Sequence, residues 1–115
     1  MMNPEVKQRW IEALNSDEYN QTKQSLKDST GFCCLGVLTD LYIKDHNQEW
    51  RVHVCGRYSF SGWSATLSSE VMDWAGIQNY WGPLKEPVGG FDTLADLNDE
   101  GYSFKQIAQV IEEQL

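Results

Sequence analysis

The segment that most constrains the fold is residues 31–42, which read Gly-Phe-Cys-Cys-Leu-Gly-Val-Leu-Thr-Asp-Leu-Tyr. At 100° per residue its apolar side chains cover an arc of about 200°, wider than the stripe of just over ~100° on an ordinary surface helix. We therefore expect a central helix that several neighbours bury, with Gly36, Asp40 and Lys44 on its remaining side. Gly36 costs roughly 0.5–1 kcal/mol inside a helix, which predicts that another backbone segment approaches it closely.

Capping signals predict further helices on both sides of this segment. Each begins after a polar side chain that can accept a hydrogen bond from the first turn, and two of them end at a glycine. The expected helices cover residues 4–15 after Asn3, a short segment through 71–75 that Thr66 or Ser68 caps and Gly76 ends, 94–100 after Asp92 or Thr93 and before Gly101, and 104–115, where Ser103 and Gln106 form a capping box. Residues 18–30 are polar and predict a loop.

A small sheet is expected between these helices. Residues 50–55 alternate with period two and predict a half-buried strand in which Trp50, Val52 and Val54 face the core. Residues 58–60 predict a second strand, and residues 78–90, with three glycines and two prolines, predict the longest loop. The sequence thus predicts one α+β domain over 1–115, with four to five helices around a buried central helix and a small antiparallel sheet.

Charge and hydropathy exclude several classes of function. Seventeen acidic residues against nine basic ones give a net charge of −8, which argues against direct nucleic-acid binding, because such binding depends on neutralising phosphates. No run approaches the ~20 apolar residues of a membrane span, and the N-terminus lacks the basic and apolar parts of a signal peptide. We therefore expect a cytoplasmic protein without a membrane partner, with its three cysteines reduced.

Three segments together resemble a family of small uncharacterised proteins encoded by bacteriophages and prophages. They are residues 31–42, then Glu-Val-Met-Asp-Trp-Ala-Gly-Ile at 70–77, then Leu-Asn-Asp-Glu-Gly-Tyr-Ser-Phe-Lys-Gln-Ile-Ala at 97–108. The likeness covers most of the chain, and residues 31–42 are its most specific part. It implies a bacterial host as the setting and a small host-binding protein as the function, and it implies no catalytic residues.

A basic strand face beside aromatic residues is the first candidate site. Guanidinium groups suit carboxylates or phosphates, and aromatic faces suit a base or a sugar. The expected ligand-binding residues are Arg51, His53 and Arg57 on one strand face, Lys23 and Lys27 near it, and Tyr58, Phe60 and Trp63 directly after it. The alternative is an ordinary solvent-facing strand, which also needs polar residues.

A cysteine nucleophile is the second candidate. Cys33 and Cys34 lie at the expected helix start, where the helix dipole lowers the pKa of a thiol, and His53 on a later strand could act as the base. We expect Cys33, as the more exposed of the two, to be the better candidate in such a thiol hydrolase. Cysteine on an apolar helix face is more often inert packing material.

Two further site types are not expected. The cysteines and histidines have no Cys-x-x-Cys or His-x-x-x-His spacing, so we expect no metal and no cofactor. Residues 94–108 resemble the first half of a helix-turn-helix, but the helix that would enter the major groove is missing. Five acidic residues and no basic one lie between Glu86 and Tyr102, which would repel phosphate.

The leading hypothesis is a non-catalytic accessory protein of the phage type. It would bind and sequester a host protein or a small anionic, nucleotide-like ligand. A thiol hydrolase is one alternative, and an acidic DNA mimic that inhibits a host DNA-binding protein is another. Tyr80 and Trp81 in the long loop fit either a protein contact or a cover over the core, and the sequence leaves that choice open.

Overall fold

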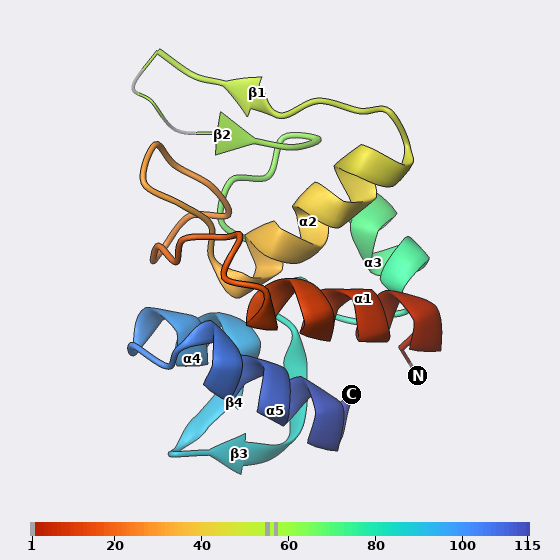
Figure 1. Ribbon diagram of the computed structural model, residues 1–115, viewed down its shortest axis with the longest axis vertical. Helices are drawn as coiled ribbons and strands as arrows, with labels where there is room; N and C mark the ends of the chain where they lie inside the picture. The colour runs from red at the N-terminus through yellow and green to blue at the C-terminus, as the bar shows by residue number, and fades with distance from the viewer. Residues whose placement is uncertain (1, 55, 57) are drawn as a thin grey trace.

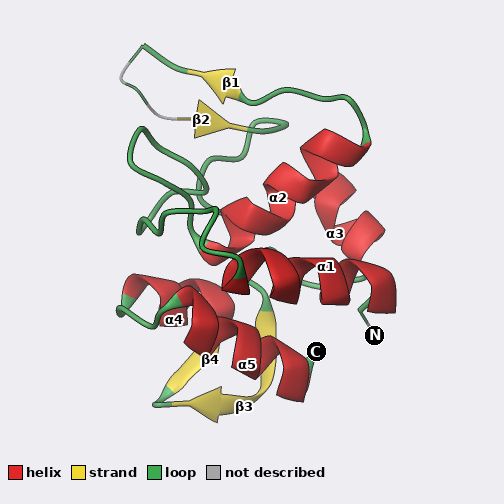
Figure 2. Ribbon diagram, in the orientation of Figure 1, coloured by secondary structure: helices red, strands yellow, loops and turns green. Residues whose placement is uncertain are grey.

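The computed structural model describes residues 2–54, 56 and 58–115. This part of the chain forms five helices and four short strands in the order α1-α2-β1-β2-α3-β3-β4-α4-α5, and the fold is α+β (Figures 1 and 2). The helices are α1 (Pro4–Asn15), α2 (Cys34–Asp45), α3 (Ser69–Ala75), α4 (Leu94–Asp99) and α5 (Phe104–Gln114). The strands are β1 (Arg51–Val52), β2 (Tyr58–Ser59), β3 (Pro83–Val88) and β4 (Phe91–Thr93).

Helix α2 is the buried centre that the sequence predicts. It contacts α1, α3 and α4, and the side chains of Cys34, Leu35, Val37 and Leu38 are completely buried. Gly36 lies where a Cβ atom would come within 1.7 Å of the carbonyl oxygen of Leu26, so the predicted close backbone approach is confirmed. The loop before α2 therefore packs directly on the helix backbone.

The start of α2 differs from the prediction. The helix begins at Cys34, three residues later than expected, because the Cys33 sulfur accepts a hydrogen bond from the backbone N–H of Gly36 and caps the first turn. Residues 30 and 31 instead belong to a turn around Asp28, whose carboxylate accepts hydrogen bonds from both backbone N–H groups. These two residues therefore belong to the preceding loop and not to the helix.

The other helix ends follow the capping signals. Asn3, Ser68, Thr93 and Ser103 each accept a hydrogen bond from the first turn of the helix that follows, and Ser103 and Gln106 form the predicted capping box. Gly76 ends α3 in the left-handed conformation, with φ of 76°, and the N–H of Ile77 bonds back to Met72. These local rules predict the helices well because each depends on a few neighbouring residues.

The strands differ most from the prediction. β1 covers only Arg51–Val52, pairs antiparallel with β2, and leaves Val52 60% and Val54 110% exposed. The prediction that these valines face the core is wrong. An alternating pattern indicates a strand, but it does not show that another layer of the protein covers the apolar face of that strand. Here the β1–β2 hairpin projects from the body of the molecule, so its valines are exposed (Figure 1).

The expected long loop at 78–90 contains a strand. β3 occupies Pro83–Val88 and pairs with β4 through a turn at Gly89 and Gly90, both of which have positive φ. The prolines obscured this strand, since proline is depleted in strands and restricted to edges and irregular positions. Each of the two sheets has two strands, and they lie at opposite ends of the molecule, with the helices between them (Figure 2).

Packing between the chain ends completes the core. α1 and α5 lie side by side, and their buried side chains join one hydrophobic cluster with those of α2, α3 and α4. Trp10 of α1 is completely buried and donates its indole N–H to the carbonyl oxygen of Cys34. None of the helices in the described residues is both long and apolar enough to cross a bilayer.

Candidate functional site

Asp40 organises a polar cluster under the β1–β2 hairpin. The prediction placed Asp40 on the open side of the central helix, but it is only 7% exposed because Tyr19 and Trp50 cover it. One carboxylate oxygen accepts from the Trp50 indole at 3.0 Å, and the other accepts from Tyr19 Oη at 2.7 Å and pairs with Lys44 at 3.0 Å. Every buried side-chain nitrogen and oxygen atom in the described residues has a hydrogen-bond partner.

The charge of Asp40 is stabilised by these donors. Burial by itself would raise the pKa of the carboxyl group, but hydrogen bonds from Tyr19, Trp50 and Lys44 outweigh burial and hold the pKa below its ordinary value of 3.8. The same contacts raise the pKa of Lys44. The cluster is a fully satisfied structural network, and it ties Trp50, directly before β1, to α2.

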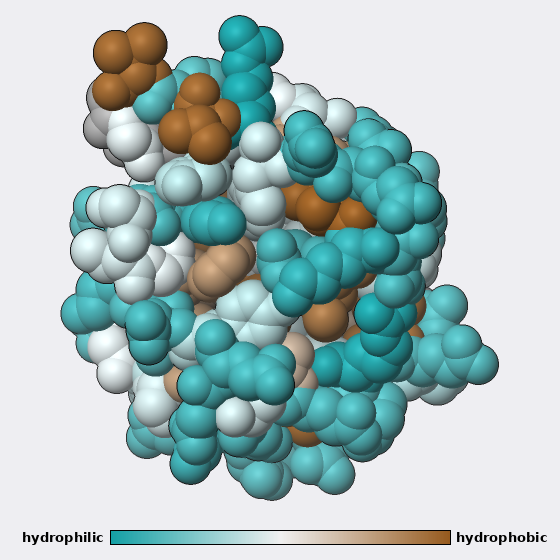
Figure 3. Space-filling model, turned by 45° about the horizontal axis from the view of Figure 1, so that its top comes forward, coloured by the Kyte–Doolittle hydropathy of each residue, from teal (hydrophilic) through white to brown (hydrophobic). Residues whose placement is uncertain are grey.

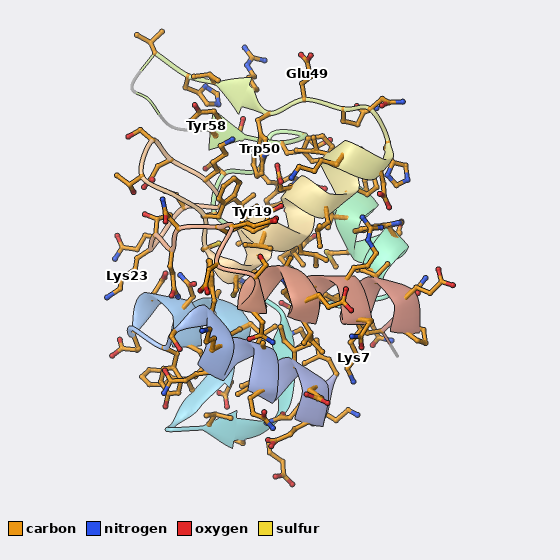
Figure 4. All side chains as sticks on the ribbon, viewed as in Figure 1. Lys7, Tyr19, Lys23, Glu49, Trp50 and Tyr58 are labelled. Carbon is orange, nitrogen blue, oxygen red and sulfur yellow. The ribbon has the colours of Figure 1, made fainter. Side chains whose placement is uncertain are left out.

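Lys27 lies among three aromatic rings beside this network. Its ammonium nitrogen is 4.7 Å from the ring centre of Tyr58, 4.9 Å from that of Phe32 and 5.7 Å from that of Trp50. Figure 4 shows Trp50 and Tyr58 together at the hairpin, with Tyr19 below them. Each distance is within the range of a cation–π interaction, so Lys27 holds the hairpin against the loop that precedes α2.

The predicted basic strand face is only partly assembled. Arg51 and His53 are exposed on the hairpin, but His53 Nε2 hydrogen-bonds to Ser59 Oγ at 2.8 Å. Lys23 lies away from the strand, beside α4, with its ammonium group 3.7 Å from where a Cβ atom on Gly101 would stand (Figure 4). The expectation that Lys23 lies near the strand face is therefore wrong, and Arg57 lies outside the described residues.

Two aromatic members of the predicted site have opposite environments. Phe60 is only 6% exposed and packs against Tyr42, so its prediction as a surface ligand contact is wrong. Trp63 is 39% exposed and stacks on Tyr80 with ring centres 5.0 Å apart and planes inclined by 20°. Residues 60–63 form a tight turn, and this turn directs the first ring inward and the second outward.

Both described thiols are buried. Cys33 is 5% exposed and Cys34 is fully buried, so the expectation of an exposed Cys33 is wrong. Burial raises the pKa of Cys33 to about 12, well above a value that gives a reactive thiolate at neutral pH, and raises that of Cys34 as well. The first thiol caps α2, and the second points at the Leu94 carbonyl oxygen. Cys55 lies outside the described residues.

Three exposed aromatic rings lie on two loops, and the sequence did not predict that these loops meet. Trp63 and Tyr80 form the stacked pair, and Trp81, the next residue along the chain, is 48% exposed. We call Trp63, Tyr80 and Trp81 the aromatic patch. The backbone holds it in place, because Leu67 donates to the Tyr80 carbonyl oxygen and Ala95 to that of Trp81.

Further apolar surface lies on the β1–β2 hairpin. Val52 and Val54 are the exposed aliphatic side chains of this hairpin, and Figure 3 shows hydrophobic atoms standing out over it at the upper left. The described residues contain no group of three or more His, Cys, Asp or Glu side chains arranged to hold a metal ion. Exposed apolar side chains, and not a cluster of metal ligands, therefore distinguish the surface of the hairpin.

Residues 2–115 match a family described as Domain of unknown function (DUF8296). The chain belongs to the DUF8296 family. No curated protein and no solved structure gives a significant match to it. The function of this DUF8296 chain is therefore inferred from the side chains on its own surface.

The exposed and the buried groups of this DUF8296 chain differ in kind. Its rings are fixed and exposed, whereas its described thiols are buried. Sequence reasoning found Trp63, Tyr80 and Trp81 separately but could not bring them together, since that requires the register between residues 63 and 80. One part of this arrangement could have been predicted. Ser-Gly between Phe60 and Trp63 predicts a two-residue hairpin turn, which brings the backbones of these two residues together.

Proposed function

We propose that this protein is a non-catalytic binding protein that contacts a partner protein through the aromatic patch. The observation that carries the proposal is the stacked pair of Trp63 and Tyr80, two large rings left 39% and 42% exposed on a chain whose core is otherwise well filled. Tryptophan and tyrosine are the residues most often found at the energetic centres of protein interfaces.

The mutual stacking of the two rings supports this proposal. A ring already held in one orientation loses little side-chain entropy when a partner covers it, so more of the burial energy is available for binding. Val52 and Val54 on the β1–β2 hairpin are exposed as well, but they are not part of the proposed contact. The two stacked rings provide the apolar centre that an interface needs.

A bacterial host protein is the partner that we propose. The resemblance to phage-encoded proteins motivates this choice, and we propose the cytoplasm of the host as the setting of the contact. A small anionic ligand is less well supported at this surface, since Lys27 is engaged with aromatic rings and Lys23 lies elsewhere. Mimicry of DNA by the acidic C-terminal helices stays a hypothesis without a specific observation in its favour.

The experiment compares protein capture by matched variants. The wild-type chain and a Trp63→Ser/Tyr80→Ser double variant are immobilised and exposed to lysate from a bacterium that carries a family member. We expect a protein that the wild type retains and the double variant loses. With that protein purified, titration calorimetry should show binding at least about tenfold weaker for the double variant, as expected for interface aromatic anchors.

The control removes exposed apolar surface from outside the aromatic patch. Val54→Ser changes a fully exposed side chain and should leave the fold intact. Thermal unfolding of all three proteins verifies that any loss of binding is not a loss of folding. Capture of the same proteins, with the same affinity, by the wild type and the double variant would overturn the proposal.

A further inference from the structure

A cavity lies at the other end of the molecule from the β1–β2 hairpin. Its volume is about 440 Å³, and it is open on one side. The start of the chain, the end of α3, strand β3 and the end of α5 form its walls, which meet where the two chain termini approach β3 (Figure 1). This volume is within the range of about 300–1,000 Å³ that is usual for small-molecule sites.

The floor of the cavity is apolar. Met2 and Ile77 are buried, with 5% and 6% exposure, and Leu84 and Leu115 are half-buried around them. These four apolar side chains come from segments that are far apart in the sequence and line one cavity. Such a surface gains free energy when an alkyl or similar apolar group covers it.

The polar side chains among the described residues of the wall are a lysine and two glutamines. Lys85 is the one charged side chain among the described residues of the lining, and Gln78 and Gln114 are its neutral polar ones. The Gln114 amide both donates to the Glu86 carbonyl oxygen and accepts from the Glu86 N–H, which fixes this part of the wall. Neither Lys85 nor Gln78 has a side-chain hydrogen bond or ion pair within the described part of the chain.

We propose that this cavity binds a small amphiphile with an apolar chain and an anionic head. The chain would lie over Met2, Ile77 and Leu84, and the head would meet the Lys85 ammonium group at the rim. An anionic head is favoured because Lys85 provides a positive charge in a protein whose net charge is −8, where an unspecific surface would repel anions. This site does not include the aromatic patch.

The test uses straight-chain carboxylates as probes. Hexanoate, octanoate and decanoate are titrated into the full-length protein below their micellar concentrations, and binding is followed by calorimetry and by amide chemical shifts. We expect one site per chain, with affinity rising about threefold to fourfold for each added methylene until the cavity is full. The shifted amides should include those of Ile77, Leu84 and Leu115.

A head-group comparison tests the role of Lys85. Decanoate is compared with decanol and with decyltrimethylammonium, and the wild type with Lys85→Gln. We expect decanoate to bind best to the wild type, and Lys85→Gln to weaken decanoate about threefold to fivefold without changing decanol. The matched control is Lys105→Gln, which removes an equally exposed lysine from the start of α5, outside the cavity lining.

Three outcomes would overturn the proposal. They are no binding of decanoate at millimolar concentration, uptake of several molecules per chain without saturation, and equal affinity for all three head groups. If decanoate binding fails while the Trp63→Ser/Tyr80→Ser variant still loses its protein partner, the cavity proposal falls and the proposed function stands. The converse result would remove the partner contact and leave the cavity site in place.

Discussion

At the scale of single residues, Cys33 shows how structural demands can take over a group that chemistry could use. Its sulfur accepts a hydrogen bond from the Gly36 N–H, so Cys33 is the N-cap of α2, a position at which serine or asparagine is more usual. Burial raises its pKa to about 12. The helix dipole, which would lower the pKa, acts on a side chain that water does not reach.

Slow alkylation of the buried thiols is the first prediction. In a Cys55→Ser variant, Cys33 and Cys34 should react with iodoacetamide at pH 8 at least about a thousandfold more slowly than a free thiol, because a rise in pKa from 9.0 to about 12 lowers the thiolate population by that factor. Mass spectrometry of the labelled protein measures the rate. Denaturant should restore full reactivity, and fast labelling without it would contradict the buried assignment.

Asp40 leads to a prediction about acid stability. Its pKa is lowered in the folded protein, so the folded state favours the ionised carboxylate more than the unfolded state does. This contribution is complete well above the ordinary value of 3.8 and is lost as the pH falls through the lower folded pKa. We expect the free energy of unfolding to fall as the pH drops below about 5, as urea titrations at several pH values would measure.

The Asp40→Asn variant isolates that contribution. It keeps the shape of the side chain but weakens the bonds from Tyr19 and Trp50 and removes the pairing with Lys44, so we expect a loss of about 2–4 kcal/mol at pH 7. The loss should shrink toward pH 3, because below the ordinary value of 3.8 the wild type progressively loses the stabilisation that comes from ionised Asp40. A loss that is the same at both pH values would show that the charge of Asp40 does not stabilise the fold.

At the scale of elements, the helices were predicted well and the strands only in part. β1 and β2 lie within the two predicted strands and pair antiparallel, whereas β3 and β4 were not expected. Asn3, Ser68 and Ser103 cap the helices that their local sequences predict. A cap depends on three or four consecutive residues, so the sequence contains the whole signal. A strand depends on a partner elsewhere in the chain, and β1 has only the two-residue β2 as its partner.

The candidate site shows the same division. Trp63 was correctly chosen as an exposed ring, whereas Phe60, three residues earlier, proved to be buried. The two residues have similar chemistry, and only the direction of the turn between them decides which one reaches water. Lys27 was predicted as a ligand contact, but its ammonium group lies among three aromatic rings. That position depends on how the loop packs on the hairpin, which the sequence does not show. Side-chain direction in loops is therefore the information that the sequence lacked.

Lys27 should be important for the attachment of the β1–β2 hairpin. Lys27→Met keeps a long flexible side chain but removes the charge that attracts the rings of Phe32, Trp50 and Tyr58. We expect a loss of about 1–2 kcal/mol of stability and faster amide hydrogen exchange at Tyr58. Lys23→Met is the matched control, because this exposed lysine lies away from the hairpin, and it should change neither quantity by much.

At the scale of the whole molecule, charge and core packing act in opposite directions. The net charge is −8, so acidic groups outnumber basic ones, and repulsion among the acidic groups is not fully balanced by attraction to basic groups. The pair Arg9–Asp45 and the pair Lys105–Asp17 are solvent-exposed, where such pairs contribute about 0–1 kcal/mol. The pair Lys44–Asp40 is better protected, since the Asp40 side chain is only 9% exposed. Repulsion among the remaining acidic groups therefore opposes the packing of the hydrophobic core.

Added salt should consequently stabilise the protein. Raising NaCl from 10 to 300 mM shortens the screening length to below about 10 Å and weakens repulsion between the carboxylates, while Lys44–Asp40 is screened less because it is protected. We expect the free energy of unfolding at pH 7 to rise by about 1 kcal/mol, measured by urea titration. A Glu112→Gln/Glu113→Gln variant, with two fewer acidic charges on exposed positions of α5, should show a smaller rise. A fall in stability with salt would mean that the exposed ion pairs outweigh the repulsion, because screening would then remove more attraction than repulsion.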